Sequence, residues 1–236
     1  MKKERIWEVD ALRGFLILCM IAVHFVIGSR FIVKWYALPA WLEVFMGRAG
    51  VLFVLLSGLS ATLGARSFRR GLIVFCCALG LELGSYLAVL FGIFDDSMVI
   101  RFGVLHLLGV SMMLWPLLKN SKPWVLTVLG VVIVALGYWF ETFYVEPKFL
   151  YALGLQARSF ASGDYYPIFP QLGWFLLGGA LGKRLYPEKK SLLPQVKSDR
   201  AGWRFLRFCG RNSLVIYLIH FLPVGAVLML LSLLLH

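Results

Sequence analysis

The sequence predicts an all-α, polytopic membrane helix bundle, and three observations support this fold class. Of the 236 residues, 60% are hydrophobic, and the mean hydropathy is +0.82. A soluble domain of this length does not bury so much apolar surface, and several apolar runs approach the ~20 residues that cross a bilayer as a helix. Basic residues also gather at alternate ends of these runs, as cytoplasmic loops do.

We expect about seven transmembrane helices in a single domain that covers residues 1–236. No linker is long enough to separate two domains, and no internal repeat is visible. The first apolar run is too long for a signal peptide and has no small-residue cleavage pattern after it. The runs place the helices at residues 11–29, 47–65, 71–94, 99–118, 124–141, 167–185 and 210–234.

The charge distribution predicts a cytoplasmic N-terminus and an extracytoplasmic C-terminus. Basic residues precede the first span, separate the second from the third and the fourth from the fifth, and recur between residues 183 and 211. The loops on the opposite side are mainly acidic. The net charge of +12 therefore reflects topology and contact with anionic lipid, and we expect no nucleic-acid partner.

The cysteines and glycines of the spans indicate packing. The four cysteines form no CxxC pair and lie within spans or at a cytoplasmic edge, so we expect neither a disulfide nor a metal site. Gly80-x-x-x-Gly84 in the third span and Gly178-x-x-x-Gly182 in the sixth allow close helix approach.

The first span carries the most informative pair of polar residues, Arg13 and His24. Eleven residues make three helical turns, so both side chains share one face and lie roughly 16 Å apart along the axis. Asp10 precedes Arg13 by three residues and can pair with it. Arg13 snorkelling to headgroups is the structural alternative. Two such groups in phase inside a membrane favour function, because charged or titratable residues are costly there.

The third and fourth spans add Glu82, Arg101 and His106. Glu82 could orient a histidine, relay protons or be protonated packing glue. Arg101 and His106 differ by about 140° around a straight helix and need not share a site. An ion pair of Arg101 with Asp95 or Asp96 is the structural alternative to a functional role. In the outer loop, Asp164 lies before the sixth span, where it could help to bind an acceptor.

The last span begins with a polar, basic segment. Asn212 or Ser213 is expected to cap this helix at the cytoplasmic edge, where a helix N-terminus favours an anion. Arg207 and Arg211 add positive charge. Further along, Ser213, Tyr217 and His220 form a polar stripe at helical spacing, and Pro223 should bend the helix beyond them.

Three motifs in this order resemble the heparan-α-glucosaminide N-acetyltransferase catalytic-domain family, over most of the chain. The Arg13-x10-His24 spacing also resembles the motif of acyltransferase-3 membrane proteins. The motifs are Asp10-x-x-Arg13-Gly14 with a span ending in His24, Arg101-Phe-Gly-Val-Leu-His106-x-x-Gly109, and Gly210-x-Asn-Ser-Leu-x-x-Tyr217-x-x-His220.

The resemblance implies a transmembrane acetyltransferase, with cytoplasmic acetyl-CoA as donor and an envelope sugar as acceptor. Because the chain is compact and shows no organelle-targeting features, we expect it in a bacterial inner membrane. Members of this family near the lysosomal enzyme carry a histidine in the first outer loop, whereas this chain has none between Phe25 and Leu105, so the resemblance implies that the catalytic role falls on His24 or His106. The donor-binding candidates are Asp10, Arg13, Arg207, Arg211, Asn212 and Ser213. The substrate-binding candidates are Glu82, Arg101, Asp164, Tyr217 and His220.

Two other functions remain open from the residues alone. Intramembrane His, Glu and Arg also serve proton-coupled transporters and flippases, for which transport would follow a proton gradient without need of CoA. A haem protein could draw two axial ligands from His24, His106 and His220. The sequence does not decide between O- and N-acetylation, between direct transfer and an acetyl-histidine intermediate, or whether the protein forms homo-oligomers.

Overall fold

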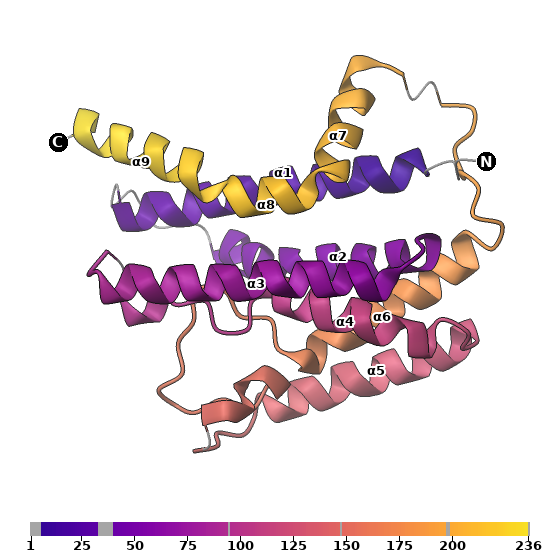
Figure 1. The fold of residues 1–236 in the computed structure, drawn as a ribbon, viewed down its shortest axis with the longest axis horizontal. Helices are drawn as coiled ribbons and strands as arrows, with labels where there is room; N and C mark the ends of the chain where they lie inside the picture. Colours follow the sequence, from indigo (N-terminus) through magenta and orange to yellow (C-terminus); the bar gives the residue numbers. More distant parts are fainter. Residues whose placement is uncertain (1–5, 33–39, 94, 147, 197–198, 236) are drawn as a thin grey trace. The chain divides into compact units, whose positions relative to one another are not determined.

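The chain folds into helices, which confirms the all-α prediction. The computed structural model describes residues 6–32, 40–93, 95–146, 148–196 and 199–235. Within these ranges there is no β-strand, only one isolated bridge between Tyr144 and Gln156. The helices are α1 (Trp7–Ile32), α2 (Ala40–Leu63), α3 (Ser67–Leu90), α4 (Val104–Leu118), α5 (Pro123–Phe140), α6 (Ile168–Leu185), α7 (Ala201–Arg211), α8 (Ser213–Ile219) and α9 (Phe221–Leu235), with 3₁₀ turns η1 (Asp96–Met98) and η2 (Lys148–Leu153) (Figure 1).

Four of the described segments are long and apolar enough to cross a membrane: Trp7–Arg30, Ser67–Leu90, Pro123–Phe140 and Ser213–Leu234. Two further apolar helices, Gly50–Leu63 and Val104–Leu118, are shorter. The structure therefore supports a membrane protein with several spanning helices. The total of seven spans and the sides on which the termini lie stay predictions.

The fourth and the last predicted spans are not continuous helices. Residues 99–103 are not helical, because the left-handed backbone at Phe102 (φ 58°) and the extended Gly103 interrupt the apolar run before α4 begins. The last predicted span is also divided: residues 210 and 211 end α7, and the helix is interrupted again at His220. Pro223 cannot donate a backbone hydrogen bond to the carbonyl one turn earlier, which favours this second interruption.

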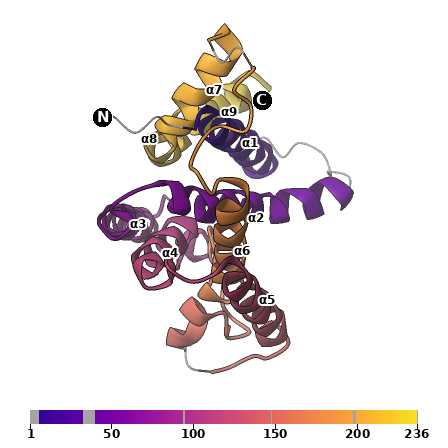
Figure 2. The same ribbon diagram turned by 90° about the vertical axis from the view of Figure 1, so that its right-hand side faces the viewer.

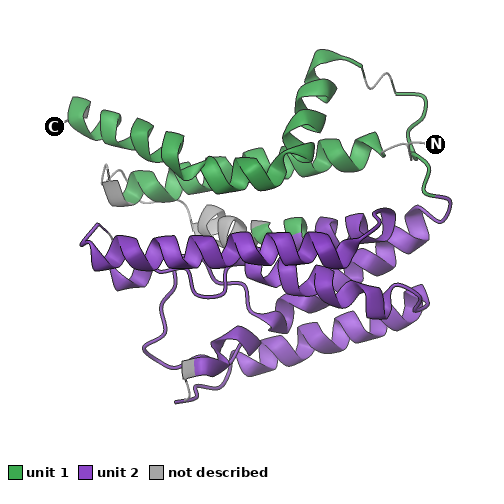
Figure 3. Cartoon of the chain, in the orientation of Figure 1, with its two compact units in different colours: residues 1–53, 189–236 green, residues 54–188 purple. Residues whose placement is uncertain are grey.

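The described chain divides into two compact units, residues 1–53 with 189–236 and residues 54–188, and the division falls inside α2 (Figure 3). In the first unit α1 is the central element, and α7, α8 and α9 contact it in turn. Figure 1 shows α8 running along α1, whereas α7 stands steeply away from it. Trp7 and Trp203 pack edge to face, with ring centroids 5.2 Å apart.

The crossing of α1 and α7 depends on two glycines. A Cβ atom on Gly14 would collide with the backbone carbonyl of Leu206 and the nitrogen of Gly210, and one on Gly210 would collide with the carbonyl of Asp10. The two helices therefore touch backbone to backbone at this point. The glycines end the Asp-x-x-Arg-Gly motif and open the Gly-Arg-Asn-Ser motif.

In the second unit, helices pack in the pairs α3 with α4 and α5 with α6 (Figure 2). Small residues again allow close approach. Gly178 faces the backbone of Leu55 in α2, and Gly182 faces Leu59, so the predicted contact through the sixth span is confirmed. At Gly80 and Gly84, a Cβ atom would have no described atom within 4 Å, so the corresponding prediction for the third span finds no partner among the described residues.

We predict that Gly14→Ala destabilises the protein by about 1–3 kcal/mol, because a methyl group forced into a tight backbone crossing overpacks it. Gly80→Ala is the matched control. The same change in an open helical position should be neutral or stabilise by up to about 1 kcal/mol, since alanine is the better helix former. Thermal unfolding of both variants in detergent measures the difference. Equal midpoints would contradict the crossing.

Candidate active site

A carboxylate shared by two arginines lies where α1 and α7 cross. The side chain of Asp10 is buried, with 7% of the residue exposed. Its Oδ1 lies 3.6 Å from Nη1 of Arg13, and its Oδ2 lies 3.2 Å from Nε of Arg211. The predicted pairing of Asp10 with Arg13 is thus confirmed, and Arg211 joins it. Two guanidinium groups around one carboxylate leave a net positive charge, which suits an anionic ligand.

The other predicted donor-binding residues are held differently. Nη2 of Arg207 lies 3.6 Å from Oδ1 of Asp199. The predicted capping of the last span is wrong for Asn212, whose side chain makes no hydrogen bond to the start of α8. Its Nδ2 instead donates to the carbonyl of Phe208, 2.9 Å away, and so caps the C-terminal end of α7. Ser213 is the first residue of α8, which has only seven residues. The structure gives this short helix no side-chain cap and therefore no support as an anion site.

Sequence reasoning missed Glu8, which anchors the segment that precedes α7. Its Oε2 accepts a hydrogen bond from Oγ of Ser191 at 2.9 Å, and its Oε1 accepts one from the backbone N–H of Leu192 at 2.7 Å. Glu8 lies less than one turn before Asp10. No spacing rule would have connected it to residues more than 180 positions away.

Two histidines, one from α1 and one from the end of α8, are in direct contact. Nδ1 of His24 lies 3.0 Å from Nε2 of His220, and the ring centroids are 4.8 Å apart. Nδ1 of His220 lies 2.6 Å from the carbonyl oxygen of Tyr217. His220 is 2% exposed, Tyr217 is buried and His24 is half-buried. The structure thus joins the predicted base to two residues that the sequence assigned to the acceptor.

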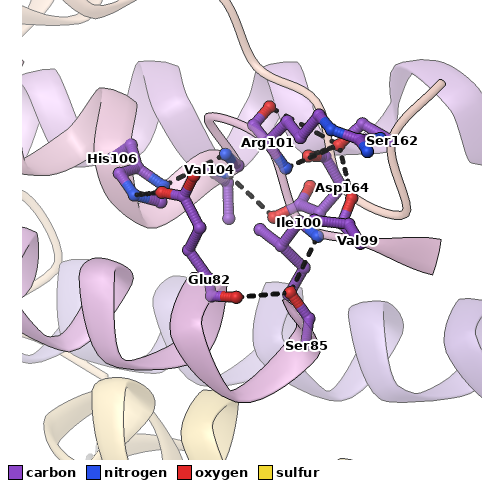
Figure 4. A network of polar contacts seen from close by, with 10 residues as sticks. Glu82, Ser85, Val99, Ile100, Arg101, Val104, His106, Ser162 and Asp164 are labelled. Atoms are coloured by element: carbon purple, nitrogen blue, oxygen red, sulfur yellow. Dashed lines mark hydrogen bonds and ion pairs between the residues drawn. The ribbon is translucent and has the colours of Figure 1, made fainter. Parts of the chain in front are cut away.

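A second polar group lies in the other unit, where Glu82 of α3 faces His106 of α4 (Figure 4). Nδ1 of His106 accepts the backbone N–H of Gly103 at 3.2 Å. Nε2 of His106 lies 3.0 Å from Oε2 of Glu82, off the ideal hydrogen-bond direction, so this contact is chiefly electrostatic. This geometry is compatible with orientation of a histidine and with proton relay, and the role of Glu82 stays a prediction.

Arg101 and Asp164 connect the loop between α5 and α6 to the start of α4 (Figure 4). Nη2 of Arg101 lies 2.8 Å from Oδ1 of Asp96, and its Nη1 donates to the carbonyl of Ala161 at 2.5 Å. Oδ2 of Asp164 accepts the first helical N–H of α4, from Val104, at 2.9 Å. The Asp96 ion pair is the structural alternative raised for Arg101. For both residues, a role in acceptor binding stays a prediction.

Ser162 is a second residue that the sequence did not single out. Its Oγ accepts the backbone N–H of Arg101 at 2.8 Å and donates to the carbonyl of Asp164 at 2.7 Å. In the same loop, Oη of Tyr165 donates to the carbonyl of Tyr151 at 2.6 Å. Burial raises the pKa of Tyr165 to about 12, so this phenol stays neutral and remains a donor at physiological pH.

The His24–His220 contact bears on the haem alternative. Two imidazoles that share one metal ion have their ligating nitrogens about 4 Å apart across it, since metal–nitrogen bonds are roughly 2 Å long. The observed 3.0 Å joins the two rings directly. In this arrangement His24 and His220 do not form an axial ligand pair. As a separate matter, for metal ions held by side chains alone, no group of three or more His, Cys, Asp or Glu side chains is found among the described residues.

Comparison with protein-family models gives a match over most of the chain. The model of a family described as "Heparan-alpha-glucosaminide N-acetyltransferase, catalytic" matches residues 5–222, which include both groups of polar residues described above. No match was found among curated proteins or among solved structures.

We predict that Asp164→Ala destabilises the protein by about 1 kcal/mol, the usual effect of removing a helix N-cap side chain. Asp164→Asn is the matched control, because its amide oxygen can still accept the N–H of Val104. Thermal unfolding separates the two variants. If alanine and asparagine have the same midpoint as the parent, the cap contributes nothing to stability.

Proposed function

Because the chain belongs to the heparan-alpha-glucosaminide N-acetyltransferase catalytic family and is thus a transmembrane acetyltransferase, we propose that it moves an acetyl group from cytoplasmic acetyl-CoA to an envelope sugar. The acceptor would be a hydroxyl or amine presented from the extracytoplasmic side. The enzyme would be a multi-pass protein of the inner membrane. The observation that carries the proposal is the family match across nearly the whole chain, which contains the arginine cluster and the histidine pair.

The donor would bind at the cytoplasmic end of α1. Arg13 and Arg211 offer two guanidinium groups beside one buried carboxylate, and Arg207 lies one turn before Arg211 on α7. Guanidinium groups bind phosphates through paired N–H donors. The phosphates of CoA fit this charge, and Asp10 would keep the two arginines oriented while the site is empty.

The position of Arg13 and His24 on one continuous helix supports an extended donor. Both residues lie within α1, and eleven residues at 1.5 Å each separate them by roughly 16 Å along the axis. With the CoA phosphates at Arg13, the pantetheine arm would run along the helix and bring the thioester towards His24.

His24 would act as general base. It takes the proton of the acceptor hydroxyl or amine as the acceptor oxygen or nitrogen forms a bond to the thioester carbonyl carbon. The carbon–sulfur bond then breaks, and the CoA thiolate receives the proton from His24. General-base catalysis of this kind contributes roughly 10²–10⁴-fold. A double displacement through an acetyl-histidine would use the same residue as nucleophile.

For Glu82, Arg101, His106 and Asp164, which lie in the second unit, acceptor binding stays a prediction from the sequence. His106 is 3% exposed and faces partners on both ring nitrogens. This arrangement suits orientation of an acceptor better than removal of its proton. His220 is one member of the histidine pair, and the carbonyl of Tyr217 contacts it; a role for either residue in substrate binding stays a prediction.

We predict that His24→Ala abolishes acetyl transfer, with a fall in kcat of about 10²-fold or more, while CoA binding persists. The base is removed, but the arginine cluster is about three turns away. Radiolabelled acetyl transfer and CoA titration measure the two properties separately. Near-normal turnover in this variant would contradict His24 as base and leave His106 as the candidate.

We predict that Arg13→Ala chiefly raises the Kd for CoA, by roughly 10–100-fold, because hydrogen bonds to a charged group contribute about 1.5–3 kcal/mol. Arg69→Ala is the matched control: Arg69 is an exposed arginine near the start of α3. Titration calorimetry with CoA compares the two. An equal effect of both substitutions would indicate general electrostatic attraction and not a phosphate site at Arg13.

A further inference from the structure

We propose that His220 is a positioning residue that fixes the tautomer of His24, so that Nε2 of His24 is the basic nitrogen of the reaction. The inference rests on the proposed function, because it concerns the same base. It assigns a role to His220 and to the Tyr217 carbonyl that neither the family match nor the sequence motifs supply.

The proton positions follow from the backbone carbonyl of Tyr217. A carbonyl oxygen only accepts hydrogen bonds, so Nδ1 of His220, 2.6 Å away, must carry a proton. In a neutral imidazole the other nitrogen is then an acceptor. Nε2 of His220 therefore presents its lone pair to Nδ1 of His24, 3.0 Å away. The tautomer of His220 is thus set by the main chain.

The tautomer of His24 follows from that of His220. Since Nε2 of His220 accepts, Nδ1 of His24 must donate and carries the proton. The second contact of this nitrogen, with Sδ of Met20 at 2.7 Å, also offers an acceptor. Nε2 of His24 is left with its lone pair, and it takes part in no polar contact with the described residues.

The local fold explains why the Tyr217 carbonyl faces an imidazole. The helix is interrupted at His220 between α8 and α9, and Pro223 supplies no N–H to the carbonyl of Ile219 one turn earlier. The ring of Phe221 packs against that of His220, with centroids 4.0 Å apart. His220 is thereby held in one orientation beside α1. A continuous helix would direct the Tyr217 carbonyl to the backbone N–H four residues later.

This chain of hydrogen bonds would support His24 as it takes a proton. Protonation at Nε2 makes His24 an imidazolium, whose Nδ1–H donates to the lone pair of His220. A hydrogen bond from a charged donor is roughly twice as strong as a neutral one, so the pair gains strength when charge develops. The contact therefore stabilises the charged form of the base, beyond its effect on orientation.

His106 provides a contrast within the same chain. Its Nδ1 accepts the N–H of Gly103, so in the neutral form the proton is on Nε2, which faces Glu82. His24 and His106 are thus predicted to be opposite tautomers. Among the described histidines, His24 is the one whose Nε2 keeps an uncommitted lone pair.

The first experiment compares His220→Gln with His220→Asn. The amide of glutamine reaches the position of imidazole Nε2, so its oxygen can still accept from His24. The amide of asparagine reaches only the position of Nδ1 and leaves His24 without an acceptor. We expect kcat to stay within about tenfold of the parent for glutamine and to fall by about 10²-fold for asparagine and for His220→Phe, with little change in the KM for acetyl-CoA.

The second experiment reads the tautomer without activity. The chain has four histidines, so ¹⁵N-histidine labelling with solid-state NMR gives few signals, and His24→Ala and His220→Phe identify those of the pair. We expect His24 to carry its proton on Nδ1 in the parent and in His220→Gln. In His220→Asn the Nε2–H form should appear. Thermal midpoints of all variants check that each one folds.

The outcomes separate the inference from the proposed function. A parent spectrum with the His24 proton on Nε2 overturns the inference, and so do equal kcat values for the glutamine and asparagine variants. If His24→Ala is inactive while His220→Phe keeps its kcat, the base assignment stands and the role of His220 fails. If His24→Ala keeps near-normal turnover, the base assignment itself fails, whatever the spectrum shows.

Discussion

The backbone contact between α1 and α7 at Gly14 and Gly210 is the constraint on which the first unit depends. It allows Arg211 of α7 to reach the carboxylate that Arg13 of α1 also contacts. Since α8 follows α7 after one residue, the same crossing directs the next helix along α1. His220 then arrives beside His24. Because Gly14 and Gly210 have no side chains, the two helices can approach closely enough for both the charge cluster and the histidine pair to form.

The periodicity and hydropathy of the sequence predicted the features that depend on the residues of a single helix. The common face of Arg13 and His24 depends on helical repeat alone, and α1 runs unbroken through both. The Asp10–Arg13 pair follows from i, i+3 spacing. The all-α class follows from apolar runs of membrane length. The positions of Gly178 and Gly182 also predicted a tight contact, because small residues one turn apart allow close helix approach, although the same pattern at Gly80 and Gly84 meets no described atom.

What the sequence did not predict depends on partners far along the chain. Asn212 was expected to cap the helix that follows it, yet its amide satisfies a carbonyl of the helix before it. Both choices satisfy an orphan backbone group, and local sequence does not rank them. Asp164 caps α4 from 60 residues away. The contact of His24 with His220 spans 196 residues and needs the α1–α7 crossing before it can form.

The histidines also illustrate how a ring nitrogen without a hydrogen-bond partner can indicate a chemical role. His106 and His220 are nearly inaccessible, and each of their ring nitrogens faces a polar partner. A buried polar atom without a partner costs about 1–3 kcal/mol, so the two bonded nitrogens of His220 are what stability alone favours, whereas Nε2 of His106 faces Glu82 without a hydrogen bond. The half-buried His24 differs. Its Nδ1 donates a hydrogen bond to His220, so its Nε2 keeps an unshared lone pair within an apolar helix. That lone pair adds nothing to packing, and a base needs it.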